Sequence, residues 1–480
     1  MFPPLQDLYR IAPEIVLCFF GMLIMLIDPF VPARRKRSMG WLALIGTLVA
    51  FVSLRCMFLN PGSAYSGLLR TDTFSLFVHG IVIAVAALGI LGSFDYLDRE
   101  NIQRGEYYAL LLFATAGMGI LAGANELITA FVGLEISSIA TYILVGFRRT
   151  ALKSNESSLK YFLLGSFATA FFLYGVALTY GATRSTRFEA INQAIAAHGS
   201  GALLILGLGL IFVGLGFKVV AAPFQIYTPD VYEGAPTPVT AVLACGPKAA
   251  AFAVMLRIFY SAFGNASHIW FWAIWVSAVL TMCIGNFAAL VQSNVKRMLA
   301  YSSIAHAGYI LVAFAALSEI GVAAVLFYLA AYAAMTLGAF LIVAHVGGVG
   351  ERRLDVSDYA GLGTSQPWVA ACFSLFLLSL LGLPATAGFV GKFYAFSAAV
   401  DHRLVWLVVI AAINSVIGAY YYLKIVVAMY FREPNKDWAP SPMRAPMFVA
   451  LLLTAVGTIY LGILPDRIMQ WAIASAHSLH

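Results

Sequence analysis

The sequence contains few charged residues. Asp, Glu, Lys and Arg make up only 11% of its 480 residues, whereas 61% are hydrophobic and the mean hydropathy is +0.88. A soluble domain typically carries roughly 25% charged residues, so this composition excludes an ordinary soluble protein. The formal net charge of +7 does not indicate a nucleic-acid partner, because the basic residues lie in short loops and form no basic face. The composition predicts an all-α polytopic membrane protein.

Motifs for bound redox groups are also missing. The five cysteines occur singly inside apolar runs, at Cys18, Cys56, Cys245, Cys283 and Cys372. Without a CxxC pair, neither an iron–sulfur cluster nor a disulfide framework is supported. We found no histidine pair suited to haem, no phosphate-binding loop and no dinucleotide fingerprint. We therefore expect no cofactor, no metal and no redox step in this chain.

Long apolar runs define the expected architecture. Runs of roughly 18 or more apolar residues predict about fourteen transmembrane spans. They start near residues 11, 41, 74, 107, 125, 158, 201, 238, 269, 300, 321, 368, 404 and 446. No loop has the length or composition of a soluble domain, so residues 1–480 are expected to form a single membrane domain. The first run lacks a small-residue cleavage site and is interpreted as a true span.

The distribution of basic residues predicts the orientation. When alternate loops are placed on opposite sides, 17 of the 29 Lys and Arg residues fall on one side and eight on the other. The positive-inside rule makes the richer side cytoplasmic and places both termini outside, in the periplasm of a bacterium.

Four charges inside the apolar runs are the main functional signal. Glu135, Lys218, Lys248 and Lys392 each lie within a run long enough to span a bilayer. A charge near the centre of a span costs about 2.5–3.5 kcal/mol, so four cost roughly 10 kcal/mol unless they find partners or water. Burial disfavours the charged form of both carboxylates and amines, which allows proton exchange near neutral pH. The pattern predicts proton handling inside a membrane.

Two spans are interrupted and two halves of the chain share a motif. Lys218 is followed by Pro223, and Pro384 with two glycines precedes Lys392. Such paired interruptions commonly mark the ion site of a transporter. The motif Ser137-Ser-Ile-Ala140 recurs as Ser302-Ser-Ile-Ala305, and each copy precedes one interrupted span by a similar distance. An internal repeat is therefore expected.

Three segments resemble the antiporter-like, proton-pumping membrane subunits of respiratory complex I, the NADH-quinone oxidoreductase. They are residues Pro223 to Pro238, Lys296 to Gly308 and Gly388 to Phe393. The resemblance covers nearly the whole chain and is greatest to the subunit N group, which includes mitochondrial NADH dehydrogenase subunit 2. Gln225 and Tyr227 depart from the pattern, since many relatives have His and Trp there.

The resemblance implies two inverted five-helix repeats, at residues 107–262 and 269–431, each with a broken helix. Glu135 and Lys218 would form the pair at the start of a proton path, Lys248 and His306 would link its halves, and Lys392 would be the terminal site. The chain would be a non-redox, proton-translocating subunit of a bacterial inner-membrane enzyme. NADH, FMN, iron–sulfur clusters and quinone would be bound by other subunits, and its partners would be other membrane-arm subunits.

Alternative interpretations remain open for the chain and for its residues. A Na⁺/H⁺ antiporter subunit shares the fold and predicts cation exchange without NADH, whereas a scaffold predicts that the buried charges are dispensable. Glu135 and Lys218 could form a static ion pair, and His306 a neutral hydrogen-bonded ring. Asp230 and Glu233 are expected to shape a loop. Lys424 and Arg257 are expected to extend to the membrane interface.

Overall fold

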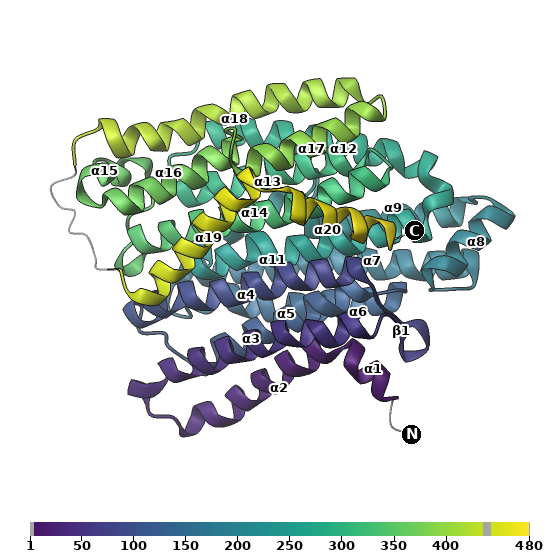
Figure 1. Ribbon diagram of the computed structural model, residues 1–480, viewed down its shortest axis with the longest axis horizontal. Helices are drawn as coiled ribbons and strands as arrows, with labels where there is room; N and C mark the ends of the chain where they lie inside the picture. The colour runs from purple at the N-terminus through teal and green to yellow at the C-terminus, as the bar shows by residue number, and fades with distance from the viewer. Residues whose placement is uncertain (1–3, 435–442, 480) are drawn as a thin grey trace.

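The computed structural model describes residues 4–434 and 443–479 and is built almost entirely of helices. The helices run side by side along the long axis of the molecule (Figure 1). Within the described residues the only strands are β1 (Gly62–Ala64) and β2 (Leu69–Thr71), which form one antiparallel hairpin. The all-α fold class is therefore confirmed.

The helix bounds follow the apolar runs. The long helices are α2 (Ala12–Ile27), α3 (Arg37–Leu59), α4 (Thr73–Arg99), α5 (Gly105–Gly123), α6 (Leu127–Val145), α7 (Leu152–Thr183), α9 (Ala202–Val219), α11 (Thr237–Leu256), α12 (Ser267–Leu290), α13 (Val295–Phe314), α14 (Glu319–Val346), α16 (Pro367–Leu381), α17 (Ala387–Asp401), α18 (Val405–Phe431) and α19 (Ala445–Ile463). The short helices are α1 (Leu5–Arg10), α8 (Phe188–His198), α10 (Thr228–Gly234), α15 (Leu362–Ser365) and α20 (Asp466–His477).

Twelve segments of the described chain are long and apolar enough to cross a membrane. Two segments of the sequence-based count are not among them. One is α13, which carries polar and basic residues along its length, and the other is the interrupted pair of α16 and α17. The count of fourteen spans therefore stays a prediction.

The two ends of the helix bundle differ in character. The end with the arginine-rich turn before α3 is called the basic-loop side, and the end with β1 and β2 is called the hairpin side. The labelled chain ends, β1 and α8 all lie at the hairpin side (Figure 1). Of the basic residues counted for the orientation, Lys436 lies outside the described residues.

Both predicted interruptions are present, and they share a backbone geometry. Helix α9 ends at Val219, and the next residue, Val220, has a left-handed φ of 65°. Helix α16 ends at Leu381, and Gly382 has a φ of 99°. In both cases the N–H of the left-handed residue donates to carbonyls three and four residues earlier, which closes the helix. Each break leaves polar backbone groups within the apolar region, and these groups need partners.

Neighbouring helix α12 satisfies the first break. The Ala222 N–H donates to Thr281 Oγ1 at 2.7 Å, and Ser277 Oγ donates to the Ala222 carbonyl at 2.6 Å. The break in α9 is thus a fixed feature of the packed structure, held by side chains from the adjacent helix.

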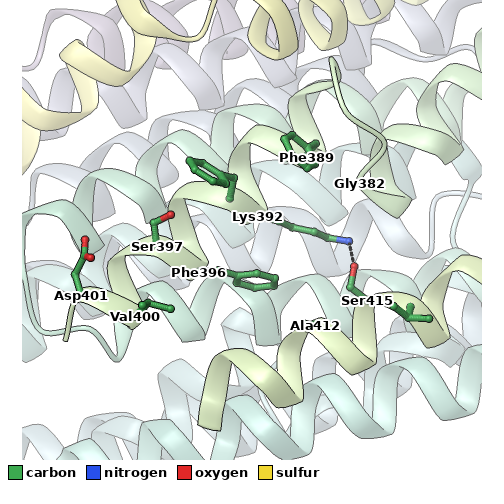
Figure 2. A pocket seen from close by; sticks show the side chains of 11 residues that line it. Gly382, Phe389, Lys392, Phe396, Ser397, Val400, Asp401, Ala412 and Ser415 are labelled. Carbon is green, nitrogen blue, oxygen red and sulfur yellow. Dashed lines mark hydrogen bonds between the residues drawn. The ribbon is translucent and has the colours of Figure 1, made fainter. Parts of the chain in front are cut away.

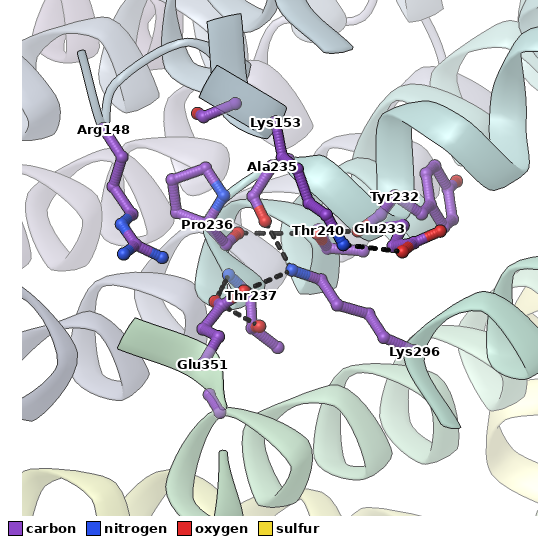
Figure 3. A network of polar contacts seen from close by, with 12 residues as sticks. Arg148, Lys153, Tyr232, Glu233, Ala235, Pro236, Thr237, Thr240, Lys296 and Glu351 are labelled. Carbon is purple, nitrogen blue, oxygen red and sulfur yellow. Dashed lines mark hydrogen bonds and ion pairs between the residues drawn. The ribbon is translucent and has the colours of Figure 1, made fainter. Parts of the chain in front are cut away.

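A buried ion pair anchors the start of α11 on the basic-loop side (Figure 3). Lys296 is fully buried and donates to the Ala235 carbonyl at 2.5 Å and to Glu351 Oε2 at 2.9 Å. Glu351 Oε1 accepts from both the N–H and the hydroxyl of Thr237, at 2.8 and 2.6 Å. Burial alone would raise the pKa of Glu351, but Lys296 and Thr237 outweigh it and hold that pKa below its ordinary value.

Replacing Glu351 with alanine is expected to destabilise the protein by about 3–5 kcal/mol, because it leaves Lys296 as an uncompensated buried charge. Thermal denaturation in detergent measures the effect. Because the folded pKa of Glu351 is lowered, its contribution should be present above the unfolded value of about 4.3 and disappear as the pH falls through the folded value. Glu156→Ala, which removes an exposed partner of Lys160, is the control and should change stability by less than about 1 kcal/mol. Equal melting of the Glu351 variant and the wild type would contradict the expectation.

Candidate functional site

Lys218 is buried in the last turn of α9, directly before the first break. Its ammonium donates to Ser138 Oγ at 2.7 Å and to Tyr142 Oη at 3.2 Å, both on α6. The rings of Tyr142 and Tyr161 lie 5.2 and 5.7 Å from the same nitrogen. The hydroxyls and ring faces replace part of the water shell that this charge loses.

Glu135 lies on α6 one turn before Ser138, but the structure does not bring it into contact with Lys218. The residue is only partly exposed, and it shares a helix face with the exposed residues Val132 and Ile139. In the described chain Glu135 makes no ion pair, and its buried Oε1 has no hydrogen-bond partner. The expected direct pairing with Lys218 is therefore not formed in this conformation.

Lys248 lies near the middle of α11, next to Pro247, and is almost fully buried. Its ammonium donates to the carbonyl and the hydroxyl of Ser303 on α13, at 2.7 and 2.6 Å. The ring of Tyr332 on α14 lies 5.0 Å from the nitrogen.

His306 lies one turn beyond Ser303 on α13 and joins three helices. Its Nδ1 lies 2.9 Å from Tyr328 Oη on α14, and its Nε2 lies 3.2 Å from Tyr422 Oη on α18. Tyr422 is also hydrogen-bonded to Ser302. The ring centroid of His306 is 5.4 Å from that of Tyr332, which contacts Lys248.

Lys392 lies on α17 directly beside the second break. Its ammonium donates to the carbonyls of Leu380 and Leu381 at 3.1 and 2.8 Å and to Ser415 Oγ at 2.9 Å. The ring of Tyr309 lies 4.8 Å from the same nitrogen. The lysine thus supplies the donors that the freed carbonyls require.

A cavity of about 500 Å³ opens next to Lys392 (Figure 2). Its wall includes Ser415, Phe396 and Ser397, and it extends to Asp401 at the last turn of α17, near the hairpin side. Lys392 therefore borders a space that also reaches the exposed side chains of Phe393 and Val416, whereas Lys248 and His306 lie in packed surroundings.

Helix α13 connects these groups into one row. Ser303 contacts Lys248, His306 follows it, and the ring of Tyr309 lies against Lys392. The row runs from Lys248 through Tyr332, His306 and Tyr309 to Lys392, and we call it the central row. Lys218 lies outside it, since no hydrogen bond in the described structure joins Lys218 to Lys248.

Sequence reasoning missed the buried tyrosines of this site. Tyr309, Tyr328, Tyr332 and Tyr422 were not among the candidate residues, but they are buried among the helices. The available signal was their position inside apolar runs, where a phenol needs a hydrogen-bond partner. Ser138 and Ser303 belong to the repeated Ser-Ser-Ile-Ala motif, so that motif contains partners of two of the predicted lysines.

The remaining candidates separate into loop and core residues. Asp230 accepts from Arg297 at 2.8 Å and Lys160 at 2.9 Å, and Glu233 pairs with Arg297 at 2.8 Å. Partial burial would raise the pKa of Asp230, but the hydrogen bonds from Lys160 and Arg297 hold it below its ordinary value. Lys424 donates to the Gln292 carbonyl at 3.2 Å.

Arg257 differs from the expectation that it extends to the interface. Its side chain is 2% exposed, and it pairs with Asp72 at 2.6 Å. Its Nε donates to the Ala122 carbonyl at 2.9 Å.

Comparisons with known proteins agree with this arrangement. Residues 124–418 match the family described as NADH:quinone oxidoreductase/Mrp antiporter, transmembrane. NADH-quinone oxidoreductase subunit N 1 of Solibacter usitatus (strain Ellin6076) is 50% identical over 477 residues, covering 99% of this chain and 98% of that protein.

Two solved structures have a similar fold. A chain of respiratory complex I from Thermus thermophilus matches with a TM-score of 0.81 and 36% identity, covering 95% of this chain and 98% of that one. A chain of the Mrp complex from Dietzia sp. DQ12-45-1b matches with a TM-score of 0.87, 98% and 97% coverage and 20% identity, which shows the fold alone. The chain belongs to the NADH:quinone oxidoreductase/Mrp antiporter transmembrane family, within the group named NADH-quinone oxidoreductase subunit N.

Proposed function

We propose that this chain is a proton-translocating membrane-arm subunit of an NADH-quinone oxidoreductase and performs no redox step itself. Electron transfer from NADH to quinone would occur on other subunits, which would hold FMN and the iron–sulfur clusters. The central row carries the proposal, because it places two buried lysines and a histidine in succession through the helix bundle. The relatives named subunit N support this assignment over a separate Na⁺/H⁺ antiporter.

The groups of the central row are chemically suited to proton relay. Serine and tyrosine hydroxyls can both accept and donate a proton, and so can a histidine ring. A lysine can release its proton when its surroundings no longer favour the charge. We infer that Lys248 passes a proton to His306 through the adjacent hydroxyls, and that Lys392 delivers it toward the cavity beside α17.

We also propose that residues 107–262 and 269–431 form two inverted repeats, each with half of the path. The shared geometry at Val220 and Gly382, with Lys218 and Lys392 beside the two breaks, supports this division. In the first repeat Lys218 contacts Ser138, one turn from Glu135 on the same helix. A change of the Lys218 rotamer would replace its contact with Ser138 by a contact with Glu135. The carboxylate would then control when Lys218 keeps its proton.

The orientation is part of the same proposal. This is a multi-pass membrane protein with bacterial relatives, and the basic loops favour the cytoplasmic side of the inner membrane. The hairpin side, with both chain ends, would then face the periplasm (Figure 1). The cavity beside Lys392 would be on the periplasmic, proton-releasing side.

Lys218→Ala tests whether the site carries protons. In inverted membrane vesicles, NADH-driven proton uptake through this path is expected to fall by roughly 10²-fold, because a positioned proton-transfer group typically contributes at least that factor. The control is Lys153→Ala, which removes an exposed lysine of the basic loops and should leave uptake unchanged. A native gel must show an assembled complex for both variants. Unchanged pumping in an assembled Lys218→Ala complex would support the scaffold interpretation instead.

The Lys392→Arg variant tests whether Lys392 exchanges its proton or only supplies a fixed positive charge. Arginine keeps the positive charge but does not release its proton at neutral pH, and the adjacent cavity of about 500 Å³ gives room for a guanidinium. We expect the complex to assemble while proton uptake is lost, with Lys160→Arg on the surface as the matched control. Retained uptake would show that Lys392 supplies only charge. Proton movement driven by a Na⁺ gradient without NADH would favour the antiporter.

A further inference from the structure

A second buried acid–base pair lies outside the central row, near the hairpin side. Glu14 on α2 and His79 on α4 are 6% and 2% exposed. Glu14 Oε1 lies 2.6 Å from His79 Nε2. Both residues precede the part of the chain that the family model matches, so the proposed proton path does not include them.

The hydrogen bonds of His79 show where a proton must be. Its Nδ1 lies 2.6 Å from the Ser75 carbonyl, and a carbonyl only accepts, so Nδ1 carries a hydrogen. At 2.6 Å, a bare Nε2 would face a carboxylate oxygen with two lone pairs opposed. One proton must therefore lie between Glu14 and His79, as imidazolium with carboxylate or as imidazole with carboxylic acid. The other carboxyl oxygen, Oε2, is buried and has no hydrogen-bond partner in the described structure.

Gly119 on α5 provides the space for this contact. A Cβ at this position would lie 2.7 Å from Glu14 Oε1 and 2.8 Å from His79 Nε2. A glycine inside a helix is less favourable than alanine, and here any larger residue would push the pair apart.

Hydrogen bonds on both sides of the Ser75 backbone lead from the pair to the end of α11. The Ser75 carbonyl accepts from His79, and the Ser75 N–H donates to Asp72 Oδ1 at 2.8 Å. The same oxygen accepts from Arg257 Nη2 at 2.6 Å. Arg257 begins the π-helical segment that directly follows α11, the helix of Lys248. π-helical turns are frequent at functional sites.

Other titratable groups around the pair are few. Cys18 lies one turn along α2, and Asp7, which pairs with Arg10, and Tyr65 lie in the adjoining hairpin-side segments. Arg257, directly after α11, is the cation on the other side. Arg70 lies beside Asp72. Two other helices that pack on α2 or α4 carry titratable groups at their hairpin-side ends. These are Arg55 and Cys56 on α3 and Glu319 on α14. Glu319 pairs with His477 on α20 at 2.9 Å. Helix α5 presents Gly119 to the pair.

We propose that Glu14 and His79 form a second proton-binding site, which exchanges its shared proton with the solution on the hairpin side. This inference rests on the proposed proton-translocating function. Release of the proton leaves a carboxylate and a neutral imidazole. Uptake restores the neutral pair. The hydrogen bonds through Ser75 and Asp72 couple this exchange to the position of α11.

Infrared difference spectroscopy of the assembled complex, recorded while the pH is changed, tests proton binding directly. The wild type should show a carboxyl band and an imidazole band that change together. Both bands should be lost in Glu14→Gln and shifted in Gly119→Ala, which keeps both titratable groups but separates them. Asp28→Asn, at the other end of α2, removes a carboxylate paired with Lys36 and should leave both bands in place. A Glu14→Gln spectrum identical to that of the wild type would overturn the proposal.

Proton pumping in the same preparations tests the transport role. The ratio of protons moved to NADH oxidised should fall in Glu14→Gln and in Gly119→Ala, and stay unchanged in Asp28→Asn. An unchanged ratio in both of the first two variants would overturn the transport role of the pair. Lys218→Ala is measured in parallel. If that variant pumps normally, the proposed function of the chain fails. The infrared result then still decides whether Glu14 and His79 bind an exchangeable proton. If Glu14→Gln does not assemble, unshifted bands in Gly119→Ala overturn the proposal.

Discussion

A backbone carbonyl inside a bilayer must find a hydrogen-bond donor, and the structure depends on how the two broken helices meet this requirement. At the break between α16 and α17, Lys392 is the donor to the carbonyls of Leu380 and Leu381. The lysine and the break therefore stabilise each other: without the break the ammonium would lose two acceptors, and without the lysine both carbonyls would lose a donor. A charge in this position is tied to the backbone geometry, and any loss of its proton changes the bonding of the helix end.

Helix α13 shows the same principle for side chains. It falls below the hydropathy of a typical span because it carries Lys296, Ser303 and His306, and each of these finds a partner on another helix. Such a helix is stable in a membrane only when other helices surround it. It packs against α12, α14, α17 and α18, with nearly every residue buried. Its polar side chains can then form a row through the bundle without contacting lipid.

The sequence was sufficient for much of this architecture, because membrane constraints are local. Apolar length predicted the spans, and Pro223 and Pro384 marked the broken helices. Partners that are distant in the chain were not predictable. Arg257 was expected at the interface. Its partner, Asp72, lies 185 residues away in the sequence, so the pairing could not be predicted. The missing contact between Glu135 and Lys218 likewise depends on how α6 is rotated against its neighbours, and a single sequence does not encode this rotation in a readable pattern.

Glu351, Glu135 and Glu14 differ in how completely they are hydrogen-bonded, and the difference follows the roles proposed for them. Both oxygens of Glu351 have donors, as expected for a carboxylate that anchors loops and a helix start. Glu135 and Glu14 each have one buried oxygen without a hydrogen-bond partner in the described structure. An unsatisfied buried acceptor costs about 1–3 kcal/mol, so these two sites are less stable than they could be. Protonation removes the negative charge that the missing donor leaves uncompensated, whereas a carboxylate with donors on both oxygens would lose hydrogen bonds on protonation. Incomplete bonding thus favours exchange at Glu135 and Glu14, and complete bonding favours a fixed charge at Glu351.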